Sequence, residues 1–456
     1  MDNQRLETRG GRNHSEVELR DVNFMPPLVE AVPLGFQHVL AMFVGNVTVP
    51  LIIAASINLP AAETIFLVQA TMFVAGVATL VQSLGIGPIG ARVPIVMGTS
   101  FAFVPVLMPI AAIYGLPAVL GAAFVGGLAM AVVGLCLRWI RFLFPTVVTG
   151  TFVVMIGIIL LPVGFTYVGG GFGAEDFGAP RHLMLAALVF VVTVGFNQFA
   201  KGFLSEMAIL IGIVTGYVAA IPLGLVNFSK ISDAGWLQLP IPFHIGLEFV
   251  PVAIGGVVLM AVVTSAESIG DIEGTVMSGS NRLPTDKELS GGVMADGLAS
   301  SFAAIFNAFP QISFSQNVGL VALTGVASRY VVAIGGGFLV IAGLIPKLGA
   351  VVTTIPNAVL GGAVVIMFGL ITAAGMKMLS SIPFDKRNML IIGVSMAVAL
   401  GLRGQEGLYA NLSDGTRAIL NSGLIPGAIV SIVLNLVLPG RGSDHGNERT
   451  QESLVD

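Results

Sequence analysis

The residues best suited to bind a polar solute lie between Asn307 and Thr324, in the stretch NAFPQISFSQNVGLVALT. Ser315, Gln316 and Asn317 place a hydroxyl and two carboxamides between apolar segments. The apolar run that follows is too short to cross a bilayer, which predicts a half-helix beginning at membrane depth. Its N-terminus presents free N–H groups and the positive end of the helix dipole. Because non-helical backbone at that depth must be buried in protein or line a cavity, the stretch indicates a binding site.

Two acidic residues, Glu267 and Asp271, follow an apolar segment in the run TSAESIGDIEGT. On a helix, Asp271 shares one polar face with Thr264 and Ser268, and Glu267 lies beside it. An ionisable group at membrane depth costs on the order of 3 kcal/mol, so carboxylates there indicate a functional site. The alternative is that the helix ends near Glu267 and that both acids lie in a loop with Glu273.

Two further ionisable residues, Asp296 and His38, lie in segments predicted to span the membrane. Asp296 occupies the middle of a Gly- and Ser-rich ninth span, where it either bonds local backbone or relays a proton. The residues alone do not decide between these roles. His38 lies in the first span, and a single histidine in a helix is more often a structural hydrogen-bond donor than a titrating group.

Composition places the chain in a membrane. Of 456 residues, 55% are hydrophobic and 10% are charged, and the mean hydropathy is +0.93. A soluble protein carries roughly a quarter charged residues. The net charge of −4 argues against a nucleic-acid partner. Cys136 is the only cysteine and the histidines show no metal-ligand spacing, so the sequence predicts neither a metal nor a cofactor.

Apolar segments recur about fourteen times between residues 31 and 437, most of them near the ~20 residues that a helix needs to cross a bilayer. Placing the N-terminus inside assigns about twice as many Lys and Arg residues to inner loops as to outer loops. The positive-inside rule therefore predicts that both termini, residues 1–30 and 439–456, are cytoplasmic tails.

An even number of spans with a long central loop, from Asn227 to His244, predicts two halves of seven spans. Because seven is odd, the second half enters from the opposite side, as in transporters that build a midplane site from broken helices. The third and tenth spans then correspond, and both place hydroxyls beside phenylalanine: Thr99-Ser100-Phe101 and Ser313-Phe314-Ser315. The predicted fold class is an all-α polytopic membrane protein built as a 7+7 inverted repeat.

One motif is misleading. Gly85-Ile-Gly87-Pro-Ile-Gly90 fits the G-x-G-x-x-G pattern of dinucleotide-binding proteins. That fingerprint needs a strand, a tight turn and a helix, whereas this run follows an apolar helical segment and contains Pro88. We interpret it as a turn at the membrane surface.

These motifs resemble a known family. Ser315-Gln316-Asn317-Val-Gly319, followed by Thr324-Gly325, is similar to the signature of the nucleobase–ascorbate transporters. Gln37-His38, Glu267-Ser-Ile-Gly-Asp271 and Asp296 also recur in that family, and the similarity covers about residues 31 to 437.

The resemblance implies short strands and half-helices in spans three and ten. It also implies a core domain (residues 31–140 and 249–347) that moves against a gate domain (residues 141–248 and 348–438). Family members are typically homodimers, and bacterial ones couple uptake across the inner membrane to protons.

The resemblance also implies roles for the candidate residues. Glu267 and Gln316 bind the base directly, Phe101 stacks on it, and Ser315 and Asn317 support the tenth-span site. Asp296, Asp271 and His38 support the core or the proton coupling. The chemistry agrees, since a carboxylate accepts from ring N–H groups and a carboxamide offers both a donor and an acceptor. Phe101 contributes an apolar face.

The substrate expected from the resemblance is xanthine, uric acid or both. Gln316-Asn317 with Glu267 resembles the xanthine and uric acid branch, since uracil permeases tend to carry an acid at position 316. Thr324-Gly-Val-Ala-Ser-Arg329 is similar to xanthine permeases. Ser100 stands where many xanthine-selective members have Asn, which leaves room for the extra oxygen of urate.

The alternatives are a uracil permease and a sulfate, bicarbonate or chloride transporter of the same architecture. An anion site would need a fixed cation near the half-helices. The first base after the motif is Arg329, and Glu267 would repel an anion. An enzyme is not expected, because the sequence shows no metal cluster and no nucleophile–base pair.

Overall fold

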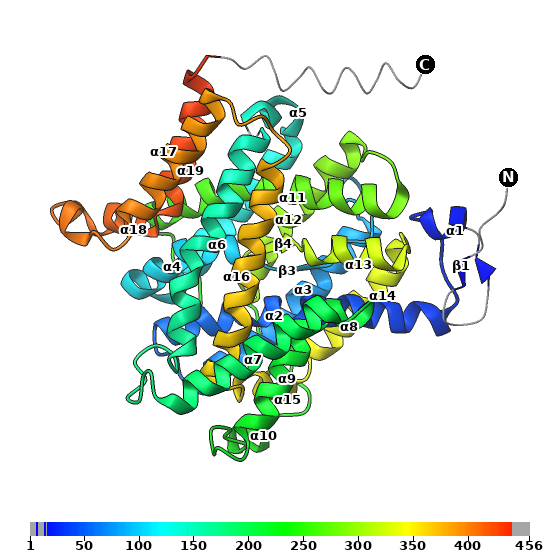
Figure 1. The fold of residues 1–456 in the computed structure, drawn as a ribbon, viewed down its shortest axis with the longest axis horizontal. Coiled ribbons are helices and arrows are strands. Elements are labelled where there is room, and N and C mark those ends of the chain that lie inside the picture. Colours follow the sequence, from blue (N-terminus) through cyan, green and yellow to red (C-terminus); the bar gives the residue numbers. More distant parts are fainter. Residues whose placement is uncertain (1–5, 8–12, 15, 144, 440–456) are drawn as a thin grey trace.

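The computed structural model describes residues 6–7, 13–14, 16–143 and 145–439, and its regular structure is almost entirely helical (Figure 1). Seven helices in this part of the chain are long and apolar enough to cross a membrane, and two sharply bent helix pairs bring the number up to nine. The protein is therefore a multi-pass membrane protein, as its composition predicts. The count of about fourteen spans stays a prediction.

The first half begins with two two-residue strands, β1 (Leu6–Glu7) and β2 (Asn13–His14), and a short helix α1 (Glu16–Arg20). The long elements that follow are α2 (Leu28–Ser56), α3 (Ala61–Leu84), β3 (Met97–Thr99), a 3-10 turn (Phe101–Phe103), α4 (Val104–Leu135), α6 (Thr146–Val168), α7 (Pro180–Phe199) and α9 (Ala208–Ala220). Short helices α5 (Leu137–Ile140), α8 (Phe203–Glu206) and α10 (Ser229–Asp233) connect them, and a second 3-10 turn covers Arg141–Leu143.

The second half repeats the pattern of long helices around one short strand. Its elements are α11 (Pro251–Ser280), α12 (Asp286–Ile305), β4 (Gln311–Ser313), α13 (Gln316–Thr324), α14 (Arg329–Gly343), α15 (Pro346–Thr353), α16 (Asn357–Leu379), α17 (Lys386–Leu402), a 3-10 turn (Glu406–Tyr409), α18 (Asp414–Ser422) and α19 (Leu424–Val437). The helices α16 and α6 pack along each other through the molecule in Figure 1.

The strands β3 and β4 join the two halves. They pair antiparallel, with Gly98 opposite Ile312, and every residue of both is buried. Each strand leads into a short helix: β4 into the nine residues of α13, and β3 into the first part of α4, which breaks at Gly115 with a φ of 79°. This confirms the half-helix predicted after Ser315-Gln316-Asn317 and the short strands that the family resemblance implies.

Glycines bring the helices into close contact. A Cβ on Gly127 of α4 would lie 2.5 Å from the carbonyl oxygen of Gly297 on α12, and a Cβ on Gly297 would lie 2.3 Å from the backbone nitrogen of Ala131. Between membrane helices, small residues permit such approach and strengthen van der Waals packing where no hydrophobic effect drives association. This contact fixes α12, which carries Asp296, against the fourth span.

The structure also decides two local alternatives. The helix α11 continues to Ser280 and buries Asp271, so the alternative in which it ends near Glu267 is wrong. The run Gly85–Gly90 forms a turn closed by a bridge between Ile86 and Ile89, as predicted. Residues 1–5, 8–12 and 15 of the N-terminal tail and residues 440–456 of the C-terminal tail lie outside the described residues.

Candidate functional site

Asp296 joins four elements at the centre of the site. It is fully buried on α12. Its Oδ1 accepts a hydrogen bond from Gln82 Nε2 of α3 (2.9 Å), and its Oδ2 accepts from Ser268 Oγ of α11 (2.5 Å) and from the backbone nitrogen of Ser313 in β4 (3.2 Å). A carboxylate with this many donors can remain buried. The contacts favour the structural role of Asp296.

Asn317 and His38 hold the start of α13. His38 Nδ1 on α2 lies 2.5 Å from Asn317 Oδ1, and the Asn317 amide donates to the carbonyl of Pro94, which precedes β3. Both side chains are almost completely buried. The half-helix is thus tied to the first span and to the segment that enters the third span, and His38 has the hydrogen-bond partner that a structural histidine needs.

Asp271 of α11 faces the junction between β4 and α13, and Glu267 lies about one helical turn before it. Asp271 Oδ1 accepts a 2.7 Å hydrogen bond from Ser315 Oγ. The other oxygen of Asp271 and Oε2 of Glu267 are buried, and neither has a hydrogen-bond partner in the described part of the chain. Because a buried acceptor without a partner costs about 1–3 kcal/mol, these oxygens are suited to receive N–H groups from a solute.

The remaining residues predicted to bind the substrate are Gln316, Ser100 and Phe101. Gln316 is half-buried and lines a small cavity with Phe314, and its carboxamide forms no hydrogen bond with any residue that the structure describes. The hydroxyl of Ser100 is buried and has no hydrogen-bond partner among the residues from 16 to 143 and 145 to 439. Phe101 packs edge-on against Phe368 of α16, with ring centroids 5.6 Å apart.

The structure therefore gathers the nine predicted residues around the β3–β4 pair, although not all are in contact. Asp271 accepts a hydrogen bond from Ser315, and Asp296 accepts one from the backbone of Ser313 in β4. His38 shares a hydrogen bond with Asn317. Glu267 and Gln316 are not joined by a hydrogen bond.

Several residues of the site were not found from the sequence. Gln82 also accepts from the backbone nitrogen of Ala91 (2.9 Å), and Asn46 Oδ1 on α2 accepts from the backbone nitrogen of Thr99 in β3 (3.0 Å). A search for uncharged amides within apolar spans would have found both, because such amides bond across helices.

Two further residues, Phe314 and Glu206, shape the site through close packing. The ring of Phe314 occupies space left by Gly45 and Gly98, where a Cβ would lie 2.7 Å and 2.4 Å from it. The half-buried carboxylate of Glu206 lies over Gly319 of α13, with Oε2 3.5 Å from the position of a Cβ.

Broken helices that meet at a buried polar site, within a bundle of apolar spans, define a membrane transporter. The chain belongs to the Permease family, whose model (Xan_ur_permease) matches residues 29–405. The resemblance to the nucleobase–ascorbate transporters is thereby confirmed, and the protein is not an enzyme.

Relatives with known names cover nearly the whole chain. Uric acid permease PucK of Bacillus subtilis (strain 168) is 38% identical over 410 residues, which cover 89% of this chain and 95% of the relative. Xanthine permease of the same organism is also 38% identical, over 90% of this chain and 93% of the relative. Xanthine permease XanP of Escherichia coli (strain K12) is 36% identical over 433 residues, covering 91% and 93%.

Solved structures share the fold at low sequence identity. The transmembrane domain of the cyanobacterial bicarbonate transporter BicA aligns with a TM-score of 0.53 and 16% identity, covering 91% of this chain and all of that domain. SLC26A9 aligns with a TM-score of 0.60 and 14% identity, covering 90% of this chain and 66% of that protein. At these identities the likeness concerns the fold alone.

Gln82→Met tests whether the Asp296 network holds the site together. The substitution removes a donor to a buried carboxylate and leaves the N–H of Ala91 without an acceptor. We therefore expect the free energy of unfolding to fall by about 1–3 kcal/mol. Gln69→Met is the control, since Gln69 is also fully buried on α3 but its side chain bonds, among the described residues, just the Gln238 carbonyl. Equal losses of unfolding temperature in the two purified variants would contradict the central role of the network.

Proposed function

We propose that the protein imports a purine base, xanthine or uric acid or both. The observation that carries the proposal is the pair of buried carboxylate oxygens on Glu267 and Asp271 that have no hydrogen-bond partner in the described part of the chain. The carboxamide of Gln316, at the start of α13, is likewise free of hydrogen bonds to any described residue. Relatives at 36–38% identity, named xanthine and uric acid permeases, support the same conclusion.

A purine dione matches these groups along its edges. Its ring N–H groups donate to the Glu267 carboxylate, while the Gln316 carboxamide donates to a ring carbonyl and accepts from a neighbouring N–H. The Phe101 ring supplies the apolar face on which the base stacks. Ser100 leaves space beside the base for the additional oxygen of urate. A base lacking one of these groups leaves a buried polar atom unsatisfied and is rejected.

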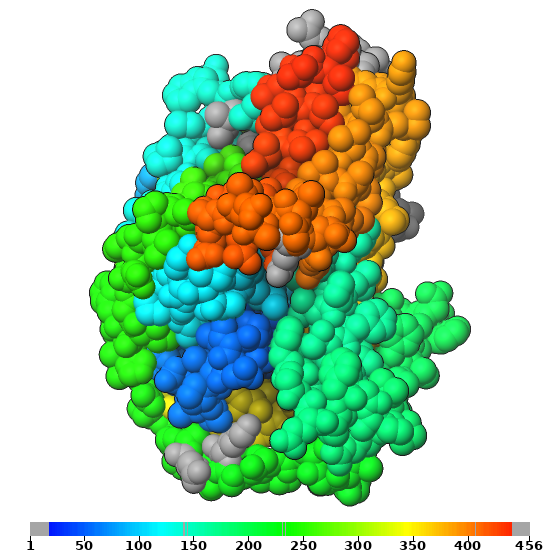
Figure 2. All heavy atoms as spheres, turned by 90° about the vertical axis from the view of Figure 1, so that its left-hand side faces the viewer, coloured from blue at the N-terminus to red at the C-terminus, as the bar shows by residue number. Residues whose placement is uncertain are grey.

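Transport proceeds by movement of a core domain (31–140 and 249–347) against a gate domain (141–248 and 348–438). The arrangement in space supports this division. The hydrogen bonds of Asp296, Asn317 and Asn46 all stay within the proposed core, whereas Phe101 and Phe368 meet across the boundary. In Figure 2 the proposed gate segments, teal and orange to red, occupy one side, and the blue and cyan segments of the proposed core occupy the other.

The protein works as a homodimer in the bacterial inner membrane, with both termini in the cytoplasm. The support is the excess of Lys and Arg in the loops assigned to the inside and the family to which the chain belongs.

An anion transporter is not favoured. The known structures with this fold include a bicarbonate transporter, but the buried carboxylate oxygens of this site need N–H donors. A purine dione supplies such donors from its ring, and sulfate and bicarbonate have no N–H group.

Glu267→Gln tests the proposed substrate contact. The neutral amide replaces a charged acceptor in a buried site, so xanthine and urate should bind at least about tenfold more weakly, since a hydrogen bond to a charged group contributes roughly 1.5–3 kcal/mol. The measurement is the ligand-induced rise in unfolding temperature of the purified protein, with hypoxanthine, uracil, sulfate and bicarbonate for comparison.

The control for this variant is Glu63→Gln, which removes an exposed carboxylate from the first turn of α3. It should leave the ligand-induced shift unchanged. A wild-type protein stabilised by sulfate or bicarbonate and by none of the bases would overturn the proposed substrate class.

Uptake is coupled to protons. In liposomes that contain the purified protein, an inward proton gradient should drive accumulation of the labelled base, and a protonophore should abolish it. A sodium gradient alone should have no effect. Accumulation that survives the protonophore and follows the sodium gradient would contradict proton coupling while leaving the substrate proposal intact.

A further inference from the structure

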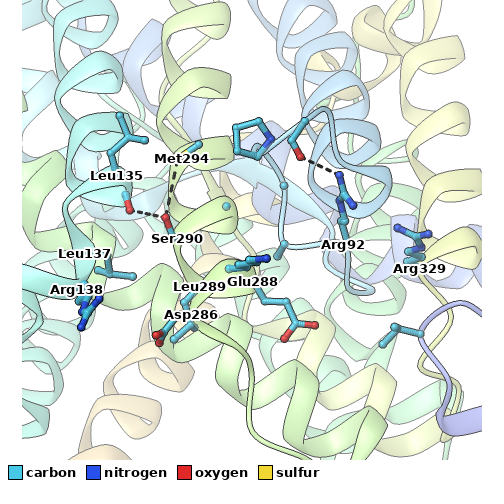
Figure 3. Close-up of a pocket in the computed structure, with 18 of the residues that line it drawn as sticks. Arg92, Leu135, Leu137, Arg138, Asp286, Glu288, Leu289, Ser290, Met294 and Arg329 are labelled. Carbon is cyan, nitrogen blue, oxygen red and sulfur yellow. Dashed lines mark hydrogen bonds between the residues drawn. The ribbon is translucent and has the colours of Figure 1, made fainter.

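A cavity of about 1020 Å³ lies away from the proposed substrate site. It is bounded by the turn Gly87–Arg92, by the junction of α4 and α5, by the start of α12 and by Arg329 at the start of α14. Figure 3 shows the side chains that line it, with Arg92 and Arg329 on one side and Arg138 on the other.

The lining carries more positive charge than negative. Arg282 forms a bidentate ion pair with Glu288, at 2.8 Å and 2.5 Å, so these two charges cancel. Four further cations line the cavity, and none of them has a carboxylate partner in the described ranges: Arg92, Arg138, Lys287 and Arg329. Asp286 is the one other acid in the lining. The cavity therefore suits an anion.

Arg92 is held in an unusual conformation. Its φ of 59° is left-handed, which is uncommon for a residue with a long side chain. The side chain lies flat over Gly85, where a Cβ would be 2.4 Å from Arg92 Nε, and Nη2 donates to the Gly87 carbonyl (2.8 Å). Backbone strain of this kind persists where the surroundings over-determine it, and it concentrates at binding sites.

The walls of the cavity are tied together. Ser290 Oγ on α12 donates to the Gly134 carbonyl on α4 (2.7 Å), a bond drawn in Figure 3. The backbone nitrogen of Gly90 donates to the Gly291 carbonyl (2.8 Å). The cations are thus presented by a preformed surface, which lowers the entropic cost of binding.

The positive-inside rule places the rim of the cavity at the cytoplasmic membrane interface. The four cations without carboxylate partners belong to loops that the positive-inside rule assigns to the cytoplasmic side. Leu135 is 64% exposed and Trp139 is 70% exposed at the adjoining helix ends, and tryptophan marks the level of lipid headgroups. A ligand that reaches this cavity from the bilayer presents a phosphate to the cations and apolar chains to the rim.

We propose that this cavity binds the phosphate headgroup of an anionic phospholipid in the cytoplasmic leaflet. Basic pockets between membrane helices on this side recognise such headgroups. The bound lipid bridges the turn before the third span and the loop before α12, and it therefore stabilises the segments that carry the strand pair. The inference does not depend on which solute the protein transports.

The test compares unfolding temperatures in nanodiscs of phosphatidylcholine alone and of phosphatidylcholine with increasing phosphatidylglycerol. Wild-type protein should be stabilised by phosphatidylglycerol, and the effect should weaken at high salt. Arg138→Gln/Lys287→Gln should need about tenfold more of the anionic lipid, since each cation near the surface contributes to the attraction. Both residues are exposed, so the variant keeps the fold.

The matched control is Lys377→Gln/Lys386→Gln, which removes two exposed cations from the end of α16 and the start of α17, also assigned to the inside but outside the cavity. It should respond to phosphatidylglycerol as the wild type does. The proposal would be overturned if both variants lost the stabilisation by phosphatidylglycerol equally, or if the wild type were not stabilised by it. Stabilisation by inorganic pyrophosphate in neutral discs, lost in the cavity variant, would assign the site to a soluble phosphate compound and overturn the lipid assignment.

Discussion

Backbone that leaves the helical form inside a membrane needs hydrogen-bond partners from protein, because lipid offers none. The strands β3 and β4 pair with each other, but four of their six backbone N–H groups donate to side-chain oxygens instead: those of Met97, Thr99, Gln311 and Ser313. The side chains of Asp296 and Asn46 then bond the backbone nitrogens of Ser313 and Thr99. This constraint explains why polar residues from α2 and α12 converge on two three-residue strands. The half-helices, and the groups they present, depend on that arrangement.

The sequence predicted the parts of this arrangement that leave a local signal. A short apolar run after Ser315-Gln316-Asn317 indicates a half-helix, and the spacing of Glu267 and Asp271 indicates a polar helix face. The fall in hydropathy after the apolar segment before Glu267 left open a helix that ends near that residue, whereas α11 continues to Ser280. Acids and hydroxyls lower hydropathy without ending a helix that is buried against its neighbours.

Other parts could not be predicted because their cause is not local. Gln82 and Asp296 are far apart in the chain, and a single amide in an apolar helix does not reveal its partner. The aromatic contact of Phe101 with Phe368 likewise depends on packing between distant spans. Fold alone also leaves the cargo open, since BicA, a bicarbonate transporter, has the same architecture. What favours a base over an anion is the chemistry of the side chains at the half-helices.

The most direct test of this account is an experimental structure of the protein with xanthine or urate bound. The account predicts density for the base between Glu267 and Gln316, with its face against Phe101 and with the strands β3 and β4 still paired. A base bound elsewhere, with Glu267 and Gln316 both turned away from it, would contradict the proposed site even if transport of the base were confirmed.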